Sequence, residues 1–262
     1  MGNSVFDEEI HVSDDRGVRT IALNRPDRLN ALTPSLMTSL ADELRTAART
    51  PAVGCVVLTG AGRGFCSGGD LRDGGERFTP SLDGGGRTEQ AFDRLRSFYE
   101  APRLLHEMPK PTIAMVNGPV AGAGIGLLGA CDLRFAGESA TFLSAFERIG
   151  AGGDFGATWF WTKILGTGVA RELLLLGEKL DARQALSKGI YTRLFPDEVL
   201  RDATMEAAQR LASGPRMAWR YMKANLNMAE DASFEAALDH EALNMGLSTM
   251  ATAQIMREMR KE

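Results

Sequence analysis

The chain contains few of the residues that build metal centres and disulfide frameworks. Its 262 residues include three cysteines and three histidines. Cys55, Cys66 and Cys131 show no CxxC spacing and lie in apolar or glycine-rich surroundings, so we interpret them as reduced thiols. The histidines are dispersed along the chain, which suggests neither a zinc site nor a histidine-based catalytic triad. We therefore expect no metal.

Long apolar runs and an excess of positive charge are also lacking. No apolar run approaches the roughly 20 residues that a bilayer requires, and the first nine residues are polar and acidic, unlike a secretion signal. The formal net charge of −4 at pH 7 argues against a protein that binds nucleic acid by neutralising its phosphates. We expect a cytoplasmic protein with neither a nucleic-acid nor a membrane partner.

Alternating strand and helix patterns predict an α/β fold with a parallel sheet. The turn Asp14-Asp15-Arg16-Gly17 suits a hairpin, and Thr33-Pro34 has the pattern of a helix N-cap followed by proline. Apolar positions from Phe92 to Leu104 predict one helix that ends before Pro109. The expected strands are residues 9–13, 17–24, 53–59, 112–116, 133–136 and 141–143.

Beyond Asp154 the pattern is almost wholly helical. We divide the chain accordingly into a core of residues 1–200 and a C-terminal helical region of residues 201–262, which packs on the core or on a neighbouring subunit. The glycine-rich segment 72–88 is expected to be a loop rather than a linker between domains.

Two glycine-rich stretches carry the strongest functional signal. They are TGAGRGFCSGGDL at residues 59–71 and NGPVAGAG at residues 117–124. Each follows a short β-branched run and leads into a helical pattern, so each presents backbone N–H groups at a helix N-terminus, where negative charge is stabilised. Two such ends can share one oxyanion. This arrangement would polarise a carbonyl group.

Four segments in order give the chain a family resemblance. Leu23-Asn24-Arg25-Pro26, Leu29-Asn30-Ala31-Leu32, the first glycine stretch and residues 110–132 together resemble the crotonase (enoyl-CoA hydratase/isomerase) superfamily. The resemblance implies a spiral of repeated strand-strand-helix turns closed by a C-terminal helical trimerisation region, in a homotrimer or homohexamer. It also implies an acyl-CoA thioester substrate, with coenzyme A as part of the substrate and no separate cofactor.

The resemblance assigns roles to individual residues. The two N–H donors of an oxyanion hole map onto Gly69 and Ala123, and an enolate requires such preorganised donors, each worth about 3 kcal/mol. Arg28, Leu29 and Ala31 would lie against the CoA phosphates and pantetheine arm. The remaining expected CoA or substrate contacts are Ser67, Gly68, Asp70, Leu71, Gly122 and Phe146, of which Ser67, Asp70 and Leu71 would line the adenine pocket.

The two glutamates that crotonase hydratases use have no counterpart here. By resemblance they fall on Gly126 and Phe146, and neither side chain can transfer a proton. Glu147 is one residue away, which on a helix turns the side chain by about 100 degrees. Ordinary two-glutamate hydration of a 2-enoyl-CoA is therefore disfavoured, although it stays open as an alternative.

Asp154 is the remaining candidate for acid/base chemistry. Residues 145–159 resemble the branch that isomerises ring epoxides in phenylacetate degradation, whose members also move 3-enoyl-CoA double bonds to the 2-position with an aspartate at this place. A single carboxylate suits allylic proton transfer, and apolar neighbours such as Phe146, Phe155 and Trp159 would raise its pKa towards useful basicity.

Three other interpretations of Asp154 and its fold stay open. Asp154 could be a helix N-cap, since a helical run follows it. It also matches the nucleophilic aspartate of aroyl-CoA dehalogenases, whose histidine falls on Tyr99, so acyl-CoA hydrolysis or dehalogenation is an alternative. A crotonase-fold protein that binds CoA without catalysis is the alternative from another class, and the small residues at both hole positions argue against it.

Overall fold

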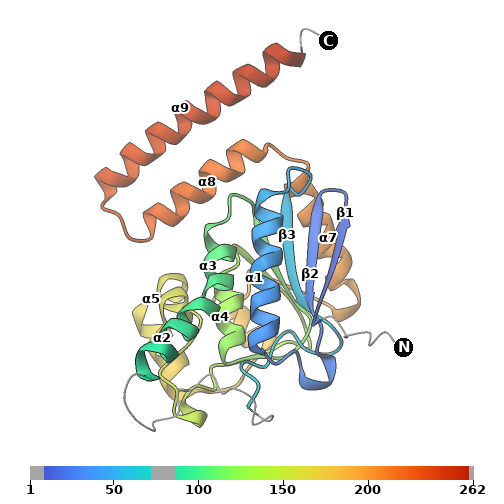
Figure 1. The fold of residues 1–262 in the computed structure, drawn as a ribbon, viewed down its shortest axis with the longest axis vertical. Coiled ribbons are helices and arrows are strands. Elements are labelled where there is room, and N and C mark those ends of the chain that lie inside the picture. The colour runs from blue at the N-terminus through green and yellow to red at the C-terminus, as the bar shows by residue number, and fades with distance from the viewer. Residues whose placement is uncertain (1–8, 72–86, 260–262) are drawn as a thin grey trace.

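The computed structural model describes residues 9–71 and 87–259, and the predicted loop over residues 72–88 lies almost wholly outside these ranges (Figure 1). Within them a six-stranded sheet has the order β1-β2-β3-β4-β6-β9, antiparallel between β1 and β2 and parallel elsewhere. Its strands are β1 (Ile10–Asp15), β2 (Val18–Leu23), β3 (Cys55–Gly60), β4 (Thr112–Val116), β6 (Leu133–Gly137) and β9 (Arg193–Phe195). The predicted α/β fold is confirmed.

Local sequence signals explain several of these elements. Arg16 and Gly17 both have positive φ, +46° and +80°, which suits the tight β1–β2 hairpin. The Thr33 hydroxyl accepts a hydrogen bond from the Leu36 N–H at 3.0 Å, so the predicted N-cap of α1 (Pro34–Arg49) is confirmed. The apolar stripe of α1 is wholly buried against the sheet.

Helices cover both faces of the large sheet (Figure 1). α1, α3 (Glu100–Glu107) and α4 (Ala123–Gly129) contribute to the main apolar cluster on one side. α7 (Asp197–Ala212) packs on the other side, where Leu200, Ala208 and Ala212 contact Val18 and Cys55. The division expected at residue 200 therefore falls inside a helix that lies on the sheet.

A smaller three-stranded sheet completes the spiral. It is formed by β5 (Val120–Ala121), β7 (Thr141–Leu143) and β8 (Leu180–Asp181) in that order. The accompanying elements are η1 (Pro26–Arg28), η2 (Glu147–Ile149), α5 (Ala157–Leu176) and α6 (Ala182–Ser187).

The single helix predicted from Phe92 to Pro109 is wrong, because two helices occupy this region. α2 (Arg87–Phe98) ends and α3 begins on either side of Tyr99. Pro102 has no N–H to donate to the carbonyl four residues before it, so it is accommodated in the first turn of a new helix and not within a continuous one.

The last two helices form a hairpin that stands away from the sheet. α8 (Arg216–Ala229) and α9 (Phe234–Met259) lie beside each other at one end of the molecule (Figure 1). Lys223 anchors α8 to the core through Asp132 at 2.8 Å and the Leu105 carbonyl at 2.8 Å. α9 exposes large apolar side chains, with Phe234 at 78% and Met250 at 71% exposure, which suits a subunit contact. No helix in the described ranges combines the length and apolar character needed to cross a membrane.

Candidate active site

Three segments from distant parts of the sequence run side by side at one end of the large sheet. The middle segment, residues 65–70, pairs with residues 28–32 through Ser67 N–H to Leu29 O at 2.9 Å and Leu32 N–H to Gly68 O at 2.8 Å. On its other side it pairs with residues 119–121 through Ala121 N–H to Cys66 O at 2.9 Å. The two glycine stretches are thus brought together, as the sequence predicted.

The Gly69 and Ala123 amides are the two predicted donors of the oxyanion hole. Leu32 is paired with the residues before and after Gly69, so the Gly69 N–H points away from Leu32, towards the side of the second glycine stretch. Ala123 is the first residue of α4, where the N–H has no partner within the helix. Neither amide donates a hydrogen bond to any atom of the described chain.

Glycine is required where these two segments meet. Gly68 has φ +91°, and a Cβ placed there would lie 3.2 Å from the Ala123 nitrogen and 3.1 Å from the Ala121 oxygen. Gly122, with φ +53°, turns the chain into α4. These two glycines set how closely the Gly69 and Ala123 amides approach one another.

The expected CoA contacts lie along the edge of the same layer. Arg28 is exposed, and Leu71 is exposed to 70% although it is apolar. The Ser67 hydroxyl donates to the Arg28 carbonyl at 3.1 Å. Asp70 differs from the expectation in one respect, because its carboxylate forms an ion pair with Arg25 at 2.8 Å. Leu29 is half-buried and Ala31 is buried.

Asn30, in the segment 28–32, is bonded to the part of the first glycine stretch that leads into the middle segment, and the sequence analysis gave it no role. It is fully buried with φ +56°, its side chain accepts from the Arg25 N–H at 2.9 Å, and it donates to the carbonyls of Ala61 and Gly64 at 3.0 and 2.8 Å. Asn tolerates the left-handed conformation better than most residues.

Asn30→Ala is expected to lower the free energy of unfolding by about 3 kcal/mol or more, since it leaves buried polar groups without partners in a strained backbone. Urea unfolding measures this. Asn30→Gly loses the same hydrogen bonds but relieves the backbone strain. It should therefore be only about 1 kcal/mol more stable than the alanine variant. An Ala variant as stable as the wild type would contradict a stabilising role for the hydrogen bonds of Asn30.

Asp154 lies on the turn that precedes α5, within an apolar wall. The Phe155 N–H donates to Asp154 Oδ1 at 3.0 Å, and Phe155 has φ +53°, an uncommon conformation for a bulky residue. Burial raises the pKa of Asp154, while hydrogen bonds from Tyr99 and the Phe155 amide oppose this rise. The helix N-cap interpretation is wrong, because Gly156 occupies the N-cap position of α5.

Phe155 also explains why α4 carries no glutamate. A Cβ placed on Gly126 would lie 2.5 Å from the Phe155 oxygen and 2.6 Å from the Phe155 Cβ. Phe146, at the second position where hydratases have glutamate, is a core residue with 6% exposure. Glu147 is exposed and bonded to the Ser144 hydroxyl at 3.0 Å. None of these positions supplies a second carboxylate beside Asp154.

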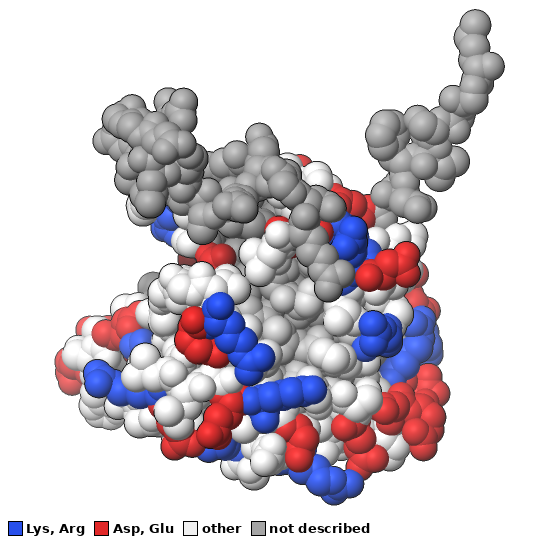
Figure 2. All heavy atoms as spheres, turned by 90° about the horizontal axis from the view of Figure 1, so that it is seen from below, with Lys and Arg blue, Asp and Glu red and all other residues white. Residues whose placement is uncertain are grey.

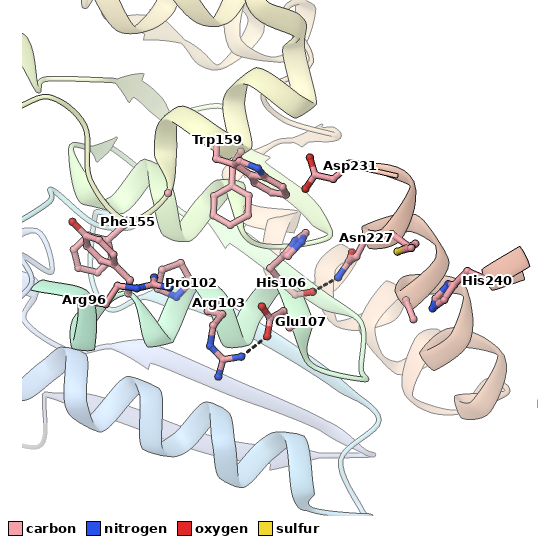
Figure 3. Close-up of a pocket in the computed structure, with 15 residues that line it drawn as sticks. Arg96, Pro102, Arg103, His106, Glu107, Phe155, Trp159, Asn227, Asp231 and His240 are labelled. Atoms are coloured by element: carbon pink, nitrogen blue, oxygen red, sulfur yellow. Dashed lines mark hydrogen bonds and ion pairs between the residues drawn. The ribbon is translucent and has the colours of Figure 1, made fainter. Parts of the chain in front are cut away.

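A cavity of about 670 Å³ is lined by Phe155 and Gly156, the two residues that follow Asp154 in the chain (Figure 3). Tyr99 and Phe155 form one wall, and Trp159 and Phe160 continue it along α5. Residues from α2 and α3 face residues of the α8–α9 hairpin across this space in Figure 3. The size of the cavity and its aromatic wall suit the acyl part of a ligand, while charged side chains such as Arg96 and Glu107 line other parts of it. His106 stacks against Trp159 and Phe160 there, with ring centroids 5.3 and 5.4 Å away.

Charge is dispersed over the end of the molecule seen from below in Figure 1. On the coloured part of Figure 2, lysine and arginine side chains alternate with aspartate and glutamate across uncharged surface. Groups of three or more histidine, cysteine or acidic side chains that could hold a metal ion do not occur among the described residues. The three cysteines are buried and unpaired, and burial raises the pKa of each thiol to about 12.

Comparison with known proteins gives consistent matches. Residues 13–261 match the family described as enoyl-CoA hydratase/isomerase. The chain is 38% identical to 1,2-epoxyphenylacetyl-CoA isomerase of Escherichia coli over 87% of its length and 85% of that protein. It is 31% identical to 4-chlorobenzoyl coenzyme A dehalogenase-2 of an Arthrobacter species over 93% and 86%. A Thermobifida fusca structure solved in complex with CoA superimposes with a TM-score of 0.85 at 27% identity, covering 94% of this chain and 95% of that one.

Proposed function

Because the chain belongs to the enoyl-CoA hydratase/isomerase family, we propose that it isomerises acyl-CoA thioesters, moving a 3-enoyl double bond to the 2-position or opening a ring epoxide by isomerisation. The observation that carries the proposal is a single half-buried carboxylate, Asp154, on a turn packed against α4, the helix that begins with the Ala123 amide.

The proposed step is a proton transfer across the allylic system. With the thioester oxygen held by the Gly69 and Ala123 amides, Asp154 takes a proton from C2, and the electron pair passes into a dienolate whose negative charge lies at the hole. The protonated Asp154 then returns the same proton to C4. The double bond has moved from the 3- to the 2-position, and atoms and charge balance.

The raised pKa of Asp154 supports this role. A carboxyl that is buried in apolar surroundings is a stronger base than one in water, and the same group is then an acid of useful strength for the return step. The E. coli relative bears the name of an isomerase. The dehalogenase relative makes hydrolysis at the same aspartate the second candidate.

The direct test is to incubate the protein with a medium-chain 3-enoyl-CoA and, separately, with its 2-enoyl isomer, and to follow products by liquid chromatography and mass spectrometry. We expect a shifted double bond at unchanged mass. A product heavier by one water would contradict the proposal in favour of hydration. Release of free CoA would favour hydrolysis, and inertness with retained CoA affinity would favour a binding role.

A further inference from the structure

Tyr99 stands where the predicted single helix is interrupted. It is the residue between α2 and α3, and its ring packs edge-on against Phe155, with centroids 5.5 Å apart and planes at 63°. Its hydroxyl is hydrogen-bonded to the Asp154 carboxyl. The break in the helix therefore brings a phenol to the one carboxylate of the proposed site.

Two uncharged donors hold Asp154. One is the Phe155 amide at 3.0 Å and the other is the Tyr99 hydroxyl. Burial and these two hydrogen bonds set the pKa of Asp154, and no charged side chain of the described residues contributes. The ionisable groups on the elements around the adjoining cavity are Arg96, Arg103, His106, Glu107, Asp231 and His240. Of these, Arg96 affects Tyr99, because its positive charge favours a lower pKa of the Tyr99 hydroxyl.

The Tyr99 hydroxyl can donate a hydrogen bond, but it cannot act as a base that removes a proton from water. Burial, and then the neighbouring Asp154, raise the pKa of the Tyr99 hydroxyl, so it stays protonated at neutral pH. His106 is seven residues further along, about 10 Å on a helix, and its Nε2 lies 3.4 Å from Glu230. Among the described residues, neither group is placed as a base that could activate water beside Asp154.

We infer that Tyr99 is a positioning residue which orients the Asp154 carboxylate for proton transfer and stabilises its ionised form. This inference rests on the proposed function and narrows it. An ester formed on Asp154, as hydrolytic dehalogenation would require, has no adjacent base to hydrolyse it among residues 9–71 and 87–259. A tyrosine in place of a general base at this position favours isomerisation over dehalogenation.

The test is Tyr99→Phe, which removes one hydroxyl and keeps the ring contact with Phe155. Loss of a hydrogen bond to the ionised carboxylate should raise the pKa of Asp154 by about one unit. The acidic limb of the kcat/KM profile for 3-enoyl-CoA isomerisation should move to higher pH by the same amount. The plateau kcat should fall as well. Because the Tyr99 ring also lines the cavity assigned to the acyl group, the shift of the pH profile and not KM is the diagnostic readout.

Tyr191→Phe is the matched control. Tyr191 is buried, and its hydroxyl has no hydrogen-bond partner among the described residues. Its loss should leave the pH profile as it is. A profile that Tyr99→Phe does not move, or that both variants move equally, would overturn the inference.

A second readout separates failure of this inference from failure of the proposed function. Titration of the protein carrying ¹³C-labelled aspartate, with Asp154→Asn to assign the signal, gives the pKa of Asp154 directly by NMR. A wild type that leaves both enoyl-CoA isomers and a ring-epoxide acyl-CoA unchanged would refute the function. The NMR titration would still decide whether Tyr99 lowers the pKa of Asp154. An unchanged pKa of Asp154 in Tyr99→Phe refutes the inference, and a raised pKa supports it.

Discussion

Replacement of Asp154 by asparagine is expected to lower kcat for double-bond isomerisation by about 100- to 10,000-fold, the range that general acid-base groups contribute. Asn has nearly the same shape, so it can still accept hydrogen bonds from Tyr99 and the Phe155 amide. It cannot carry the proton between C2 and C4. Steady-state kinetics on a 3-enoyl-CoA measure the effect, and KM should change little.

Stability provides the control for this variant. Because burial raises the pKa of Asp154, the folded protein binds that proton more tightly than the unfolded chain. The wild type therefore loses stability as the pH rises from the unfolded towards the folded pKa. The Asn variant has no such loss, so at neutral pH its unfolding midpoint should equal or exceed that of the wild type. Full turnover in Asp154→Asn would refute the proposed mechanism.

The second large effect concerns the oxyanion hole, whose donors are backbone groups. Ala123→Pro removes one N–H at the first position of α4, where proline is tolerated because the helix does not use that donor. We expect kcat to fall by about 100- to 1,000-fold, the effect of losing one such donor. Ligand affinity for free CoA, measured by calorimetry, should change far less.

Ala123→Gly is the control for the proline variant. It changes the side chain of a residue that is 4% exposed and keeps the N–H, which the proline variant lacks. It should therefore retain most of the wild-type kcat. If the glycine variant lost as much activity as the proline variant, packing at this position and not the amide would be responsible.

Elements governed by local rules were predictable from the sequence. The hairpin at Arg16-Gly17 and the cap at Thr33 depend on residues that are neighbours in the chain. The meeting of the two glycine stretches followed from their common place after buried parallel strands. The roles of the Gly69 and Ala123 amides were predicted by resemblance, and in the structure neither donates a hydrogen bond to the described chain.

Features that depend on distant contacts were not predictable in the same way. The Tyr99–Asp154 hydrogen bond joins the junction between α2 and α3 to the turn that precedes α5, which lies more than 50 residues further along the chain. The apolar periodicity from Phe92 to Leu104 gave no sign of this junction, although Pro102 itself was a usable signal. Asn30 was likewise visible only as part of a motif, because its partners Ala61 and Gly64 lie in another segment.

The contact between Gly126 and Phe155 restricts how this site could change its reaction. A Cβ at 126 would meet the backbone oxygen of Phe155 at 2.5 Å and its backbone carbonyl carbon at 3.0 Å. These atoms are present whichever residue stands at 155, so a smaller side chain there does not make room for a glutamate on α4. The turn that carries Asp154 would itself have to move away from α4. Conversion of the single-carboxylate site into a two-carboxylate hydratase therefore requires a change of backbone and not of side chains alone.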